Sequence, residues 1–325
     1  MKQALISIVV AFYNEEDSIP AFFREVGAVA QTLNAPVEYI CVNDGSSDAT
    51  LELLQRQLSV MPAIRIVNLA RNFGKEAAIS AGLAHARGDA VIVMDADLQD
   101  PPSLIAEFVA KWREGFDVVY GVRASRKADG LAKRVTARLF YAIFNWLTEV
   151  KIPPGAGDFR LMDRRVVDAV LSLPERNRFM KGIFAWVGFR QTSVSFVREA
   201  RVAGRSGWTY FRLADFAIDG ITSFSIAPLR LASLAGVFVS LLGFSYAAIL
   251  IARTLIFGVD VPGYASVMVV MMFLGGVQLG CLGLIGEYLG RLYIEAKGRP
   301  LYIVADVFGE PPASVAERPD SLAAE

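Results

Sequence analysis

The sequence is poor in the side chains that most often carry metal or nucleophilic chemistry. It has one histidine, His85, and two cysteines, Cys41 and Cys281, among 325 residues. A single histidine excludes histidine-rich zinc sites and most catalytic triads. The cysteines lie in apolar surroundings without partners at metal-ligand spacing, so we expect packing residues and no disulfide framework. His85 falls in a helical pattern, and we interpret it as a packed or surface residue.

Glycine-rich nucleotide fingerprints and an excess of positive charge are also absent. No predicted strand is followed by Gly-x-Gly-x-x-Gly, and the chain has no Gly-x-x-x-x-Gly-Lys-Ser/Thr. These absences exclude a dinucleotide-binding fingerprint and a P-loop. Lys and Arg balance Asp and Glu at 33 each. A protein that follows nucleic-acid phosphates normally carries a basic excess, so we expect no nucleic-acid partner.

Long apolar stretches are present near the C-terminus, in a chain that is 54% hydrophobic. Residues 232–252 contain no charged residue, and Gln278 is the one strongly polar residue in 264–285. Each stretch is long enough to cross a hydrocarbon core of ~30 Å as a helix. The sequence therefore predicts a two-helix transmembrane hairpin over residues 229–290. Two buried helices of a soluble domain are the alternative.

Basic residues near the hairpin predict its orientation. Arg230 precedes the first span, and Arg291, Lys297 and Arg299 follow the second. The positive-inside rule places these ends in the cytoplasm, although Arg253 on the far side counts against this. The first residues show no signal-peptide cleavage site, so we expect the N-terminal part in the cytoplasm as well.

The remaining features of the C-terminal part concern its tail and its glycines. Residues 291–325 are predicted to form a cytoplasmic tail that is disordered after about residue 309. Gly276 and Gly280, then Gly286 and Gly290, have the spacing that lets membrane helices approach closely. This spacing suits contact within the hairpin or a homo-oligomer that forms through the transmembrane helices.

Before the hairpin, short β-branched runs alternate with helical patterns. We predict strands at residues 6–10, 39–42, 64–67, 91–94 and 118–120, and helices at 19–29, 49–58, 75–87 and 102–114. This alternation predicts an α/β domain over residues 1–228, with a mostly parallel sheet and helices on both faces. Ligands bind beyond the carboxyl ends of the strands in such sheets. Polar, acidic or glycine-bearing segments follow the strands at residues 13–15, 43–48, 71–75, 95–97 and 121–123.

The end of the fourth predicted strand is the most informative of these segments. Asp95 and Asp97 follow the apolar run 91–94 and are separated by one residue. Two carboxylates at the rim of a sheet can hold a divalent cation that neutralises the diphosphate of a sugar nucleotide. An ordinary acidic turn before a proline-started helix at Pro101 is the alternative.

Two segments combine apolar residues at helical spacing with basic residues. They cover about residues 130–150 and 208–225, and such amphipathic helices suit the bilayer interface. Core helices of the α/β domain are the alternative. Residues 153–158, rich in proline and glycine, predict a flexible loop that either closes over a sugar or is an ordinary connection.

Five motifs, in this order and spacing, resemble the inverting glycosyltransferase family 2 with a GT-A fold, in its polyprenyl-phosphate (bactoprenol) branch. They cover residues 9–16, 42–48, 72–75, 95–99 and 157–161, and the two spans follow them. The soluble half is also similar to dolichyl-phosphate mannose synthases. The two-span tail is more similar to the bactoprenol enzymes. One position departs from the family's pattern, because its paired acidic turn begins with Asn43 here.

The resemblance implies a role for each motif. It implies a nucleoside pocket lined by Ala11, Tyr13, Glu15 and Asp44. It implies that Asp95, Asp97 and Gln99 hold Mg²⁺ or Mn²⁺ and, with Ala96, the donor diphosphate. It also implies that Arg123 binds a phosphate oxygen. We add Asp158 as a catalytic candidate that contacts sugar hydroxyls or positions the acceptor, beside Asp97 and Arg123.

The acceptor chemistry favours arginines over a histidine base. A phosphate monoester has a second pKa near 6, so it is largely anionic at neutral pH and needs no strong general base. Two anions must instead be held together, and guanidinium groups grip phosphate oxygens in bidentate fashion. We predict Arg126, Arg201 and Arg205 as phosphate-binding residues, with Arg201 or Arg205 on the acceptor. Attraction of these arginines to the membrane surface is the alternative.

The predicted function is transfer of one hexose, with inversion, from a nucleotide sugar to polyprenyl (undecaprenyl) phosphate, for cell-envelope glycosylation. The predicted donor is UDP-glucose, and GDP-mannose or an amino sugar donor is the alternative. The predicted location is the bacterial inner membrane, as a multi-pass protein with a cytoplasmic catalytic domain. A processive synthase is disfavoured because two spans are few and the Gln-x-x-Arg-Trp motif is absent. An inactive membrane scaffold is the alternative of another class.

Overall fold

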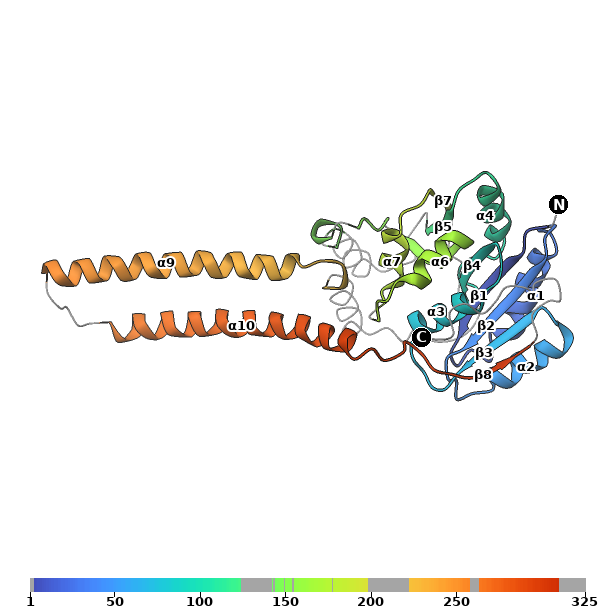
Figure 1. The fold of residues 1–325 in the computed structure, drawn as a ribbon, viewed down its shortest axis with the longest axis horizontal. Coiled ribbons are helices and arrows are strands. Elements are labelled where there is room, and N and C mark those ends of the chain that lie inside the picture. The colour runs from blue at the N-terminus through green and yellow to red at the C-terminus, as the bar shows by residue number, and fades with distance from the viewer. Residues whose placement is uncertain are drawn as a thin grey trace.

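The fold is that of a computed structural model of the chain, in which an α/β domain carries a long two-helix hairpin (Figure 1). The structure describes residues 3–123, 142, 144–148, 150–153, 155–176, 178–197, 222–257 and 263–309. The hairpin extends away from the α/β domain, so the two parts are distinct in space (Figure 1).

A mixed, mostly parallel sheet is the centre of the α/β domain. In the described residues its strands are β1 (Ile6–Phe12), β2 (Val37–Asn43), β3 (Ile64–Leu69), β4 (Ala90–Asp95), β5 (Val118–Arg123), β6 (Ala156–Asp163), β7 (Gln191–Phe196) and β8 (Val304–Phe308). They lie in the order β7-β5-β6-β4-β1-β2-β3-β8. β1 to β4 run parallel, as do β5 and β7, whereas β6 is antiparallel to β4 and β5, and β8 is antiparallel to β3. The predicted mostly parallel sheet is confirmed.

Helices cover both faces of this sheet, as predicted. Their bounds are α1 (Ile19–Ala30), α2 (Thr50–Val60), α3 (Lys75–His85), α4 (Leu104–Arg113), α6 (Arg164–Ser172) and α7 (Met180–Trp186). Alternate residues of a strand point to opposite faces, so Val9 and Val10 of β1 join different apolar clusters. One cluster includes Phe22 of α1 and Phe108 of α4, and the other includes Ile79 of α3.

The two membrane-length helices are confirmed as α9 (Ala227–Phe257) and α10 (Tyr264–Ala296). Both are long and apolar enough to cross a membrane, and none of their apolar stretch is buried within the protein. Apolar side chains that face outward along a whole helix are unfavourable in water, which contradicts the alternative of two buried core helices.

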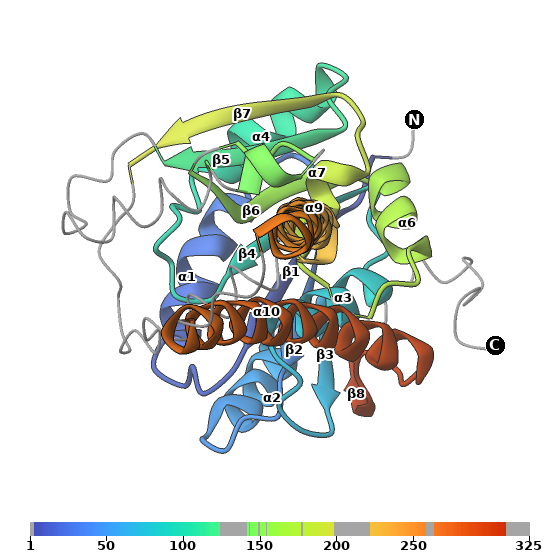
Figure 2. The same ribbon diagram turned by 90° about the vertical axis from the view of Figure 1, so that its left-hand side faces the viewer.

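The chain returns to the sheet after the hairpin, and the sequence analysis missed this strand. β8 pairs with β3, and Figure 2 shows it at the opposite edge of the sheet from β7. The backbone N–H of Ala70 donates to the Ile303 carbonyl at 2.9 Å. Near the end of α10, the backbone N–H of Arg176 donates to the Glu295 carboxylate at 2.9 and 3.1 Å. The α/β domain therefore holds the chain on both sides of the hairpin.

Three other predictions concern the segments between β5 and α9. Residues 156–158 belong to β6, so the prediction of a flexible loop over 153–158 is wrong for them, because pairing with β5, where Ala156 lies opposite Val122, outweighs the glycine-rich composition. In the first predicted interfacial helix, residues 144–147 are helical, with Phe144 buried and Trp146 74% exposed. Most of that helix, and residues 208–221 of the second, lie outside the described residues.

Candidate active site

Strand register brings four of the predicted segments to one edge of the sheet. Ala11 of β1 pairs with Val42 of β2 on one side and with Asp95 of β4 on the other. β6 is antiparallel to β4 with Val93 opposite Arg160, so the first residues of β6 lie beside the last residues of β4. Asp158 thereby reaches the same edge as Asp95, although the two are far apart in the sequence.

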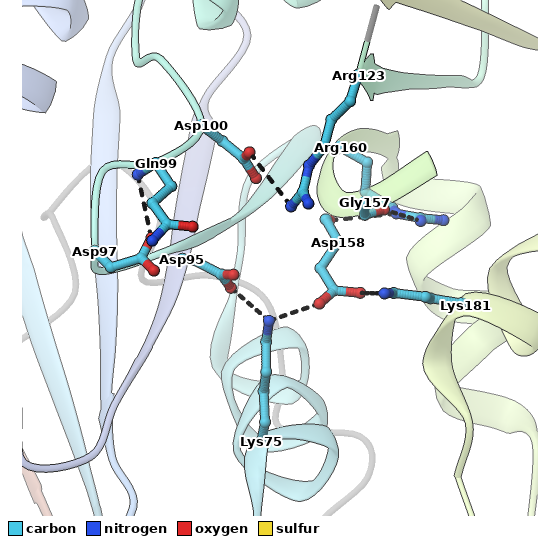
Figure 3. A network of polar contacts seen from close by, with 10 residues as sticks. All are labelled: Lys75, Asp95, Asp97, Gln99, Asp100, Arg123, Gly157, Asp158, Arg160 and Lys181. Atoms are coloured by element: carbon cyan, nitrogen blue, oxygen red, sulfur yellow. Dashed lines mark hydrogen bonds and ion pairs between the residues drawn. The ribbon is translucent and has the colours of Figure 1, made fainter. Parts of the chain in front are cut away.

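Lys75 joins these two carboxylates. Its Nζ lies 2.6 Å from Asp95 Oδ1 and 2.6 Å from Asp158 Oδ2, and Figure 3 shows it rising from α3 between them. Lys181 of α7 approaches Asp158 Oδ1 from the other side at 3.9 Å. Two cations therefore flank Asp158, one of them shared with Asp95.

These charges fix the protonation states in the site. Burial opposes ionisation of Asp158, but the positive charges of Lys181 and Lys75 outweigh it and hold the Asp158 pKa well below its usual range. Burial likewise lowers the Lys75 pKa, and Asp158 and Asp95 raise it above its ordinary value. Asp158 is therefore a carboxylate at neutral pH and a weak general base, suited to accept hydrogen bonds and to orient a ligand.

Arg160 lies behind Asp158 and is buried. Its Nη2 donates to the Gly157 carbonyl at 2.7 Å, and its guanidinium stacks on the Phe184 ring at 4.0 Å. Burial lowers the Arg160 pKa to about 10, against the opposing charges of Asp158 and Glu76. Arg160 therefore stays charged at neutral pH and supports the start of β6.

The turn after β4 presents Asp97 and Gln99. The Gln99 backbone N–H donates to Asp97 Oδ1 at 3.1 Å, and Leu98 between them has φ of 53°. This left-handed conformation costs a branched residue about 1–2 kcal/mol. Such strain persists where the surrounding structure enforces it, often at functional sites. Figure 3 shows the Gln99 side chain beside Asp97.

Arg123 closes the rim on the side of β5. Its Nη2 lies 3.9 Å from Asp100 Oδ1, and the side chain points from the end of β5 toward Asp100 (Figure 3). Asp100 is buried and follows the Asp97 turn by three residues. The structure thus brings Asp95, Asp97, Gln99, Asp158 and Arg123 to one region of the sheet edge.

Asp44 holds the turn that leads into α3. Its Oδ1 accepts from the Phe73 backbone N–H at 2.8 Å and its Oδ2 from that of Gly74 at 3.0 Å. Burial raises the pKa of the Asp44 carboxyl, although these hydrogen bonds and the charge of Arg71 oppose the shift. At Gly45, a Cβ would lie 2.3 Å from the Arg71 carbonyl carbon, so only glycine fits. Asp44 therefore fixes the segment that delivers Lys75 to the site.

The loop after β1 is bonded to the loop after β2. The Asn14 side-chain oxygen accepts from the Ser47 backbone N–H at 2.9 Å, and the Asn14 backbone N–H donates to Ser46 Oγ at 3.0 Å. The Glu15 backbone N–H donates to Thr50 Oγ1 at 2.9 Å. Tyr13 remains 49% exposed, free to meet a ligand.

The acidic residues fit a cation that arrives with a phosphate ligand. Among the residues that the structure describes, no three His, Cys, Asp or Glu side chains are close enough to form a metal site. Mg²⁺ is usually bound through one or two carboxylates together with substrate phosphates, not by an all-protein cage. Asp95 and Asp97 supply two carboxylates at the end of β4, with Gln99 next to them (Figure 3). The donor set therefore suits a metal diphosphate.

Two residues of the site were not predicted from the sequence, and some predicted residues are not placed in the site by the structure. Lys75 stood in a recognised strand-end motif, but its contact with Asp158 depends on β6, which was not predicted. Lys181 had no signal in the sequence. Arg126, Arg201 and Arg205 lie outside the described residues, and Ala96 is buried.

Glu76, next to Lys75, makes the site sensitive to pH. Burial and the negative charge of Asp158 raise the Glu76 pKa from 4.5 to about 7. The folded protein thus holds this proton more tightly than the unfolded chain does. Its contribution to stability is complete below the unfolded pKa and is lost as the pH rises toward 7. Above pH 7 the stability lost through Glu76 no longer changes with pH.

We expect the Glu76→Gln variant to exceed the wild type in melting temperature by more at pH 8 than at pH 5. Glutamine keeps an acceptor for the Met180 backbone N–H and removes the ionisation. Thermal denaturation between pH 5 and pH 8 checks this, with Glu114→Gln at an exposed position as the control. A difference that does not grow with pH would contradict it.

Comparisons with known proteins identify the family of the chain. A family model described as "Glycosyl transferase family 2" matches residues 7–171, and one described as "GtrB C-terminal hairpin" matches residues 227–292. An uncharacterized glycosyltransferase of Synechocystis sp. is 56% identical over 304 residues, or 94% of this chain and 96% of that protein. A prophage-derived bactoprenol glucosyl transferase of Shigella flexneri is 47% identical over 299 residues, or 92% and 97%.

Solved structures are similar to part of the chain at lower sequence identity. One is glucosyl-3-phosphoglycerate synthase from Mycobacterium tuberculosis in complex with Mn²⁺, UDP-glucose and phosphoglyceric acid. It is similar over 67% of this chain and 78% of its own, with 20% identity and a TM-score of 0.45.

Proposed function

Because the chain belongs to glycosyltransferase family 2 and its residues 227–292 match the GtrB C-terminal hairpin, we propose that it transfers one glucose from UDP-glucose to a polyprenyl phosphate. The observation that carries this proposal is the group of charges at the carboxyl end of β4, where Lys75 joins Asp95 to Asp158 and Asp97 follows in the next turn. The relative from Shigella flexneri, named a bactoprenol glucosyl transferase, supports both the sugar and the lipid.

The reaction is a single displacement at the anomeric carbon. An oxygen of the lipid phosphate forms the new bond to this carbon as the bond to the UDP oxygen breaks, so the configuration inverts and UDP leaves with the bonding electrons. The attacking phosphate is already anionic, so no proton has to be removed by a strong base. This agrees with the low pKa of Asp158.

Each charged residue of the site has a task in this scheme. Asp95 and Asp97 would hold Mg²⁺ or Mn²⁺, with Gln99 beside them, and the ion supplies Lewis-acid stabilisation of the departing diphosphate. Arg123 would bind a phosphate oxygen. Asp158, kept ionised by Lys75 and Lys181, accepts hydrogen bonds from sugar hydroxyls and orients the donor.

The path of the chain supports a site on the cytoplasmic face of a membrane. β5 precedes the hairpin and β8 follows it, and both belong to one sheet. A hairpin of two spans returns the chain to the side on which it entered, so the α/β domain and β8 share one face of the bilayer. Arg230 near the start of α9, and Arg291, Lys297 and Arg299 near the end of α10, favour the cytoplasm for that face. A lipid phosphate in the same leaflet lies within reach of the domain.

Purified full-length protein in detergent, given labelled UDP-glucose, undecaprenyl phosphate and Mn²⁺, is expected to yield a chloroform-soluble labelled lipid. EDTA should abolish the product and added Mn²⁺ or Mg²⁺ should restore it. The sugar should have the β configuration by NMR, opposite to that of the donor. GDP-mannose and UDP-N-acetylglucosamine should give less than about a tenth of the product. A scaffold without activity would give no labelled lipid with any donor.

A further inference from the structure

A hydrogen-bonded chain of side chains crosses three neighbouring strands, from β8 at the edge of the sheet to the candidate active site. In the sheet, Asn43 of β2 is paired with Asn68 of β3, and Asn68 with Asp306 of β8. The Asn43 Nδ2 donates to Asn68 Oδ1 at 2.8 Å, and the Asn68 Nδ2 donates to Asp306 Oδ2 at 3.1 Å. At the other end, the Ser46 backbone N–H donates to Asn43 Oδ1 at 3.4 Å. The chain therefore connects the strand after the membrane hairpin to the turn that contains Asp44.

Asp306 sets the donor-to-acceptor direction of this hydrogen-bonded chain. An ionised carboxylate only accepts hydrogen bonds, so Asn68 must turn its amide nitrogen toward Asp306 and its oxygen toward Asn43. Residue 43 must then donate, and Asn43 does so while its own oxygen accepts from Ser46. Asn43 is 2% exposed, so water cannot replace a missing partner.

An aspartate at position 43 would break the chain in either orientation of Asn68. With Asn68 as it stands, the new carboxylate would face the Asn68 oxygen. With Asn68 turned around, its oxygen would face the Asp306 carboxylate. Two acceptors oppose each other in both cases, and this gives a physical reason for asparagine where the family's acidic turn has aspartate.

The turn at the end of this chain is part of the site. Asp44 follows Asn43 and binds the backbone of Phe73 and Gly74, directly before Lys75. Ser46 Oγ accepts from the backbone of Asn14, next to the exposed Tyr13. A shift of the Asn43 amide would move both the turn and the Tyr13 loop, without any contact between Asn43 and a ligand.

We propose that Asn43, Asn68 and Asp306 are positioning residues through which the strand after the membrane hairpin sets the nucleotide-binding turn. The proposal rests on the proposed function, because donor binding is what the turn serves. β8 then has a second task besides closing the sheet edge. It presents Asp306, the charged residue that sets the direction of these hydrogen bonds.

Variants that reverse the donor and acceptor roles in this hydrogen-bonded chain test the proposal. We expect Asn43→Asp to raise the KM for UDP-glucose about tenfold, because two acceptors then face each other without a proton, either at the part-buried contact of residue 43 with Asn68 or at the exposed contact of Asn68 with Asp306. Asp306→Asn alone should change KM less than about twofold, since its amide oxygen accepts from Asn68 as the carboxylate did. In the double variant the new amide donates to Asn68 and Asn68 donates to Asp at 43. The KM should return to within about twofold of the wild type, with kcat nearly constant throughout.

A second double variant controls for net charge. Asn43→Asp combined with Glu52→Gln removes one exposed carboxylate from α2, where Glu52 pairs with Arg56, and leaves the chain broken. It should keep the raised KM. Equal rescue by Glu52→Gln and Asp306→Asn would overturn the proposal, because charge alone would then explain the effect. A fall in kcat at constant KM would also overturn it, since that result indicates loss of folded enzyme.

Hydrogen exchange at the Ser46 amide gives a readout that needs no turnover. Exchange should be faster in Asn43→Asp, because repulsion from the Asn68 oxygen displaces the carboxylate that would accept from Ser46, and it should return toward the wild-type rate in the Asn43→Asp, Asp306→Asn variant. If the exchange follows this pattern but the wild type makes no labelled lipid, the proposed function fails and the hydrogen-bonded chain stands. If the wild type is active but neither exchange nor KM responds, the positioning chain fails.

Discussion

The Asp97→Asn variant is expected to transfer glucose at least about a thousandfold more slowly than the wild type. Asparagine has the shape of aspartate, and its side-chain oxygen can still accept from the Gln99 backbone N–H, so the strained turn at Leu98 keeps its geometry. What is lost is the negative charge that a metal diphosphate needs on this side of the site. The departing UDP then carries its developing charge without full compensation.

Two measurements separate this effect from unfolding. Turnover should stay low when Mn²⁺ is raised, whereas the melting temperature without metal should stay within a few degrees of the wild type. Calorimetric titration should show weaker binding of Mn²⁺ in the presence of UDP. Asp168→Asn, at an exposed carboxylate of α6, is the matched control and should leave turnover unchanged. A fully active Asp97→Asn enzyme would remove the metal site from this turn.

The elements that the sequence predicted well are those with a local pattern. The first five strands and the helices between them follow from β-branched runs and helical spacing. β6 was missed because its start, Ala156 to Asp158, has the composition of a loop and becomes a strand only beside β5, while β4 pairs with the later residues 160–163. β8 was missed because its partner β3 is more than two hundred residues earlier, as the Asn68–Asp306 bond over a separation of 238 shows. No local pattern records such pairing.

The residues of the site also divide into those that a local sequence pattern predicts and those that depend on distant pairing. Residues at the ends of predicted parallel strands, such as Asp95 and Arg123, could be grouped because parallel strands end at one edge of a sheet. The contact of Lys75 with Asp158 could not, because it needs the antiparallel placement of β6. The departure at Asn43 was visible in the sequence, but its reason lies in a strand that follows the membrane hairpin.

The Lys75→Met variant should show how much the site depends on its central cation. Without Lys75, the carboxylates of Asp95 and Asp158 lose a partner that lies 2.6 Å from each. Removing one member of a buried pair typically costs 3–5 kcal/mol. Here 42% of the Lys75 side chain is exposed, so solvent screens part of the interaction. We expect the free energy of unfolding to fall by about 2 kcal/mol.

Turnover should fall about a hundredfold in the same variant, because Asp158 loses the 2.6 Å ion pair that holds its carboxylate in place. Binding of Mn²⁺ with UDP should then raise the melting temperature more in Lys75→Met than in the wild type, since the cation would neutralise Asp95 and replace part of the lost charge. Lys181→Met is the matched control. It removes a cation 3.9 Å from Asp158 with no ion pair to Asp95, so its stability loss should be smaller and its response to Mn²⁺ that of the wild type. An equal response of all three proteins to Mn²⁺ and UDP would mean that Lys75 and the metal do not act on the same carboxylate.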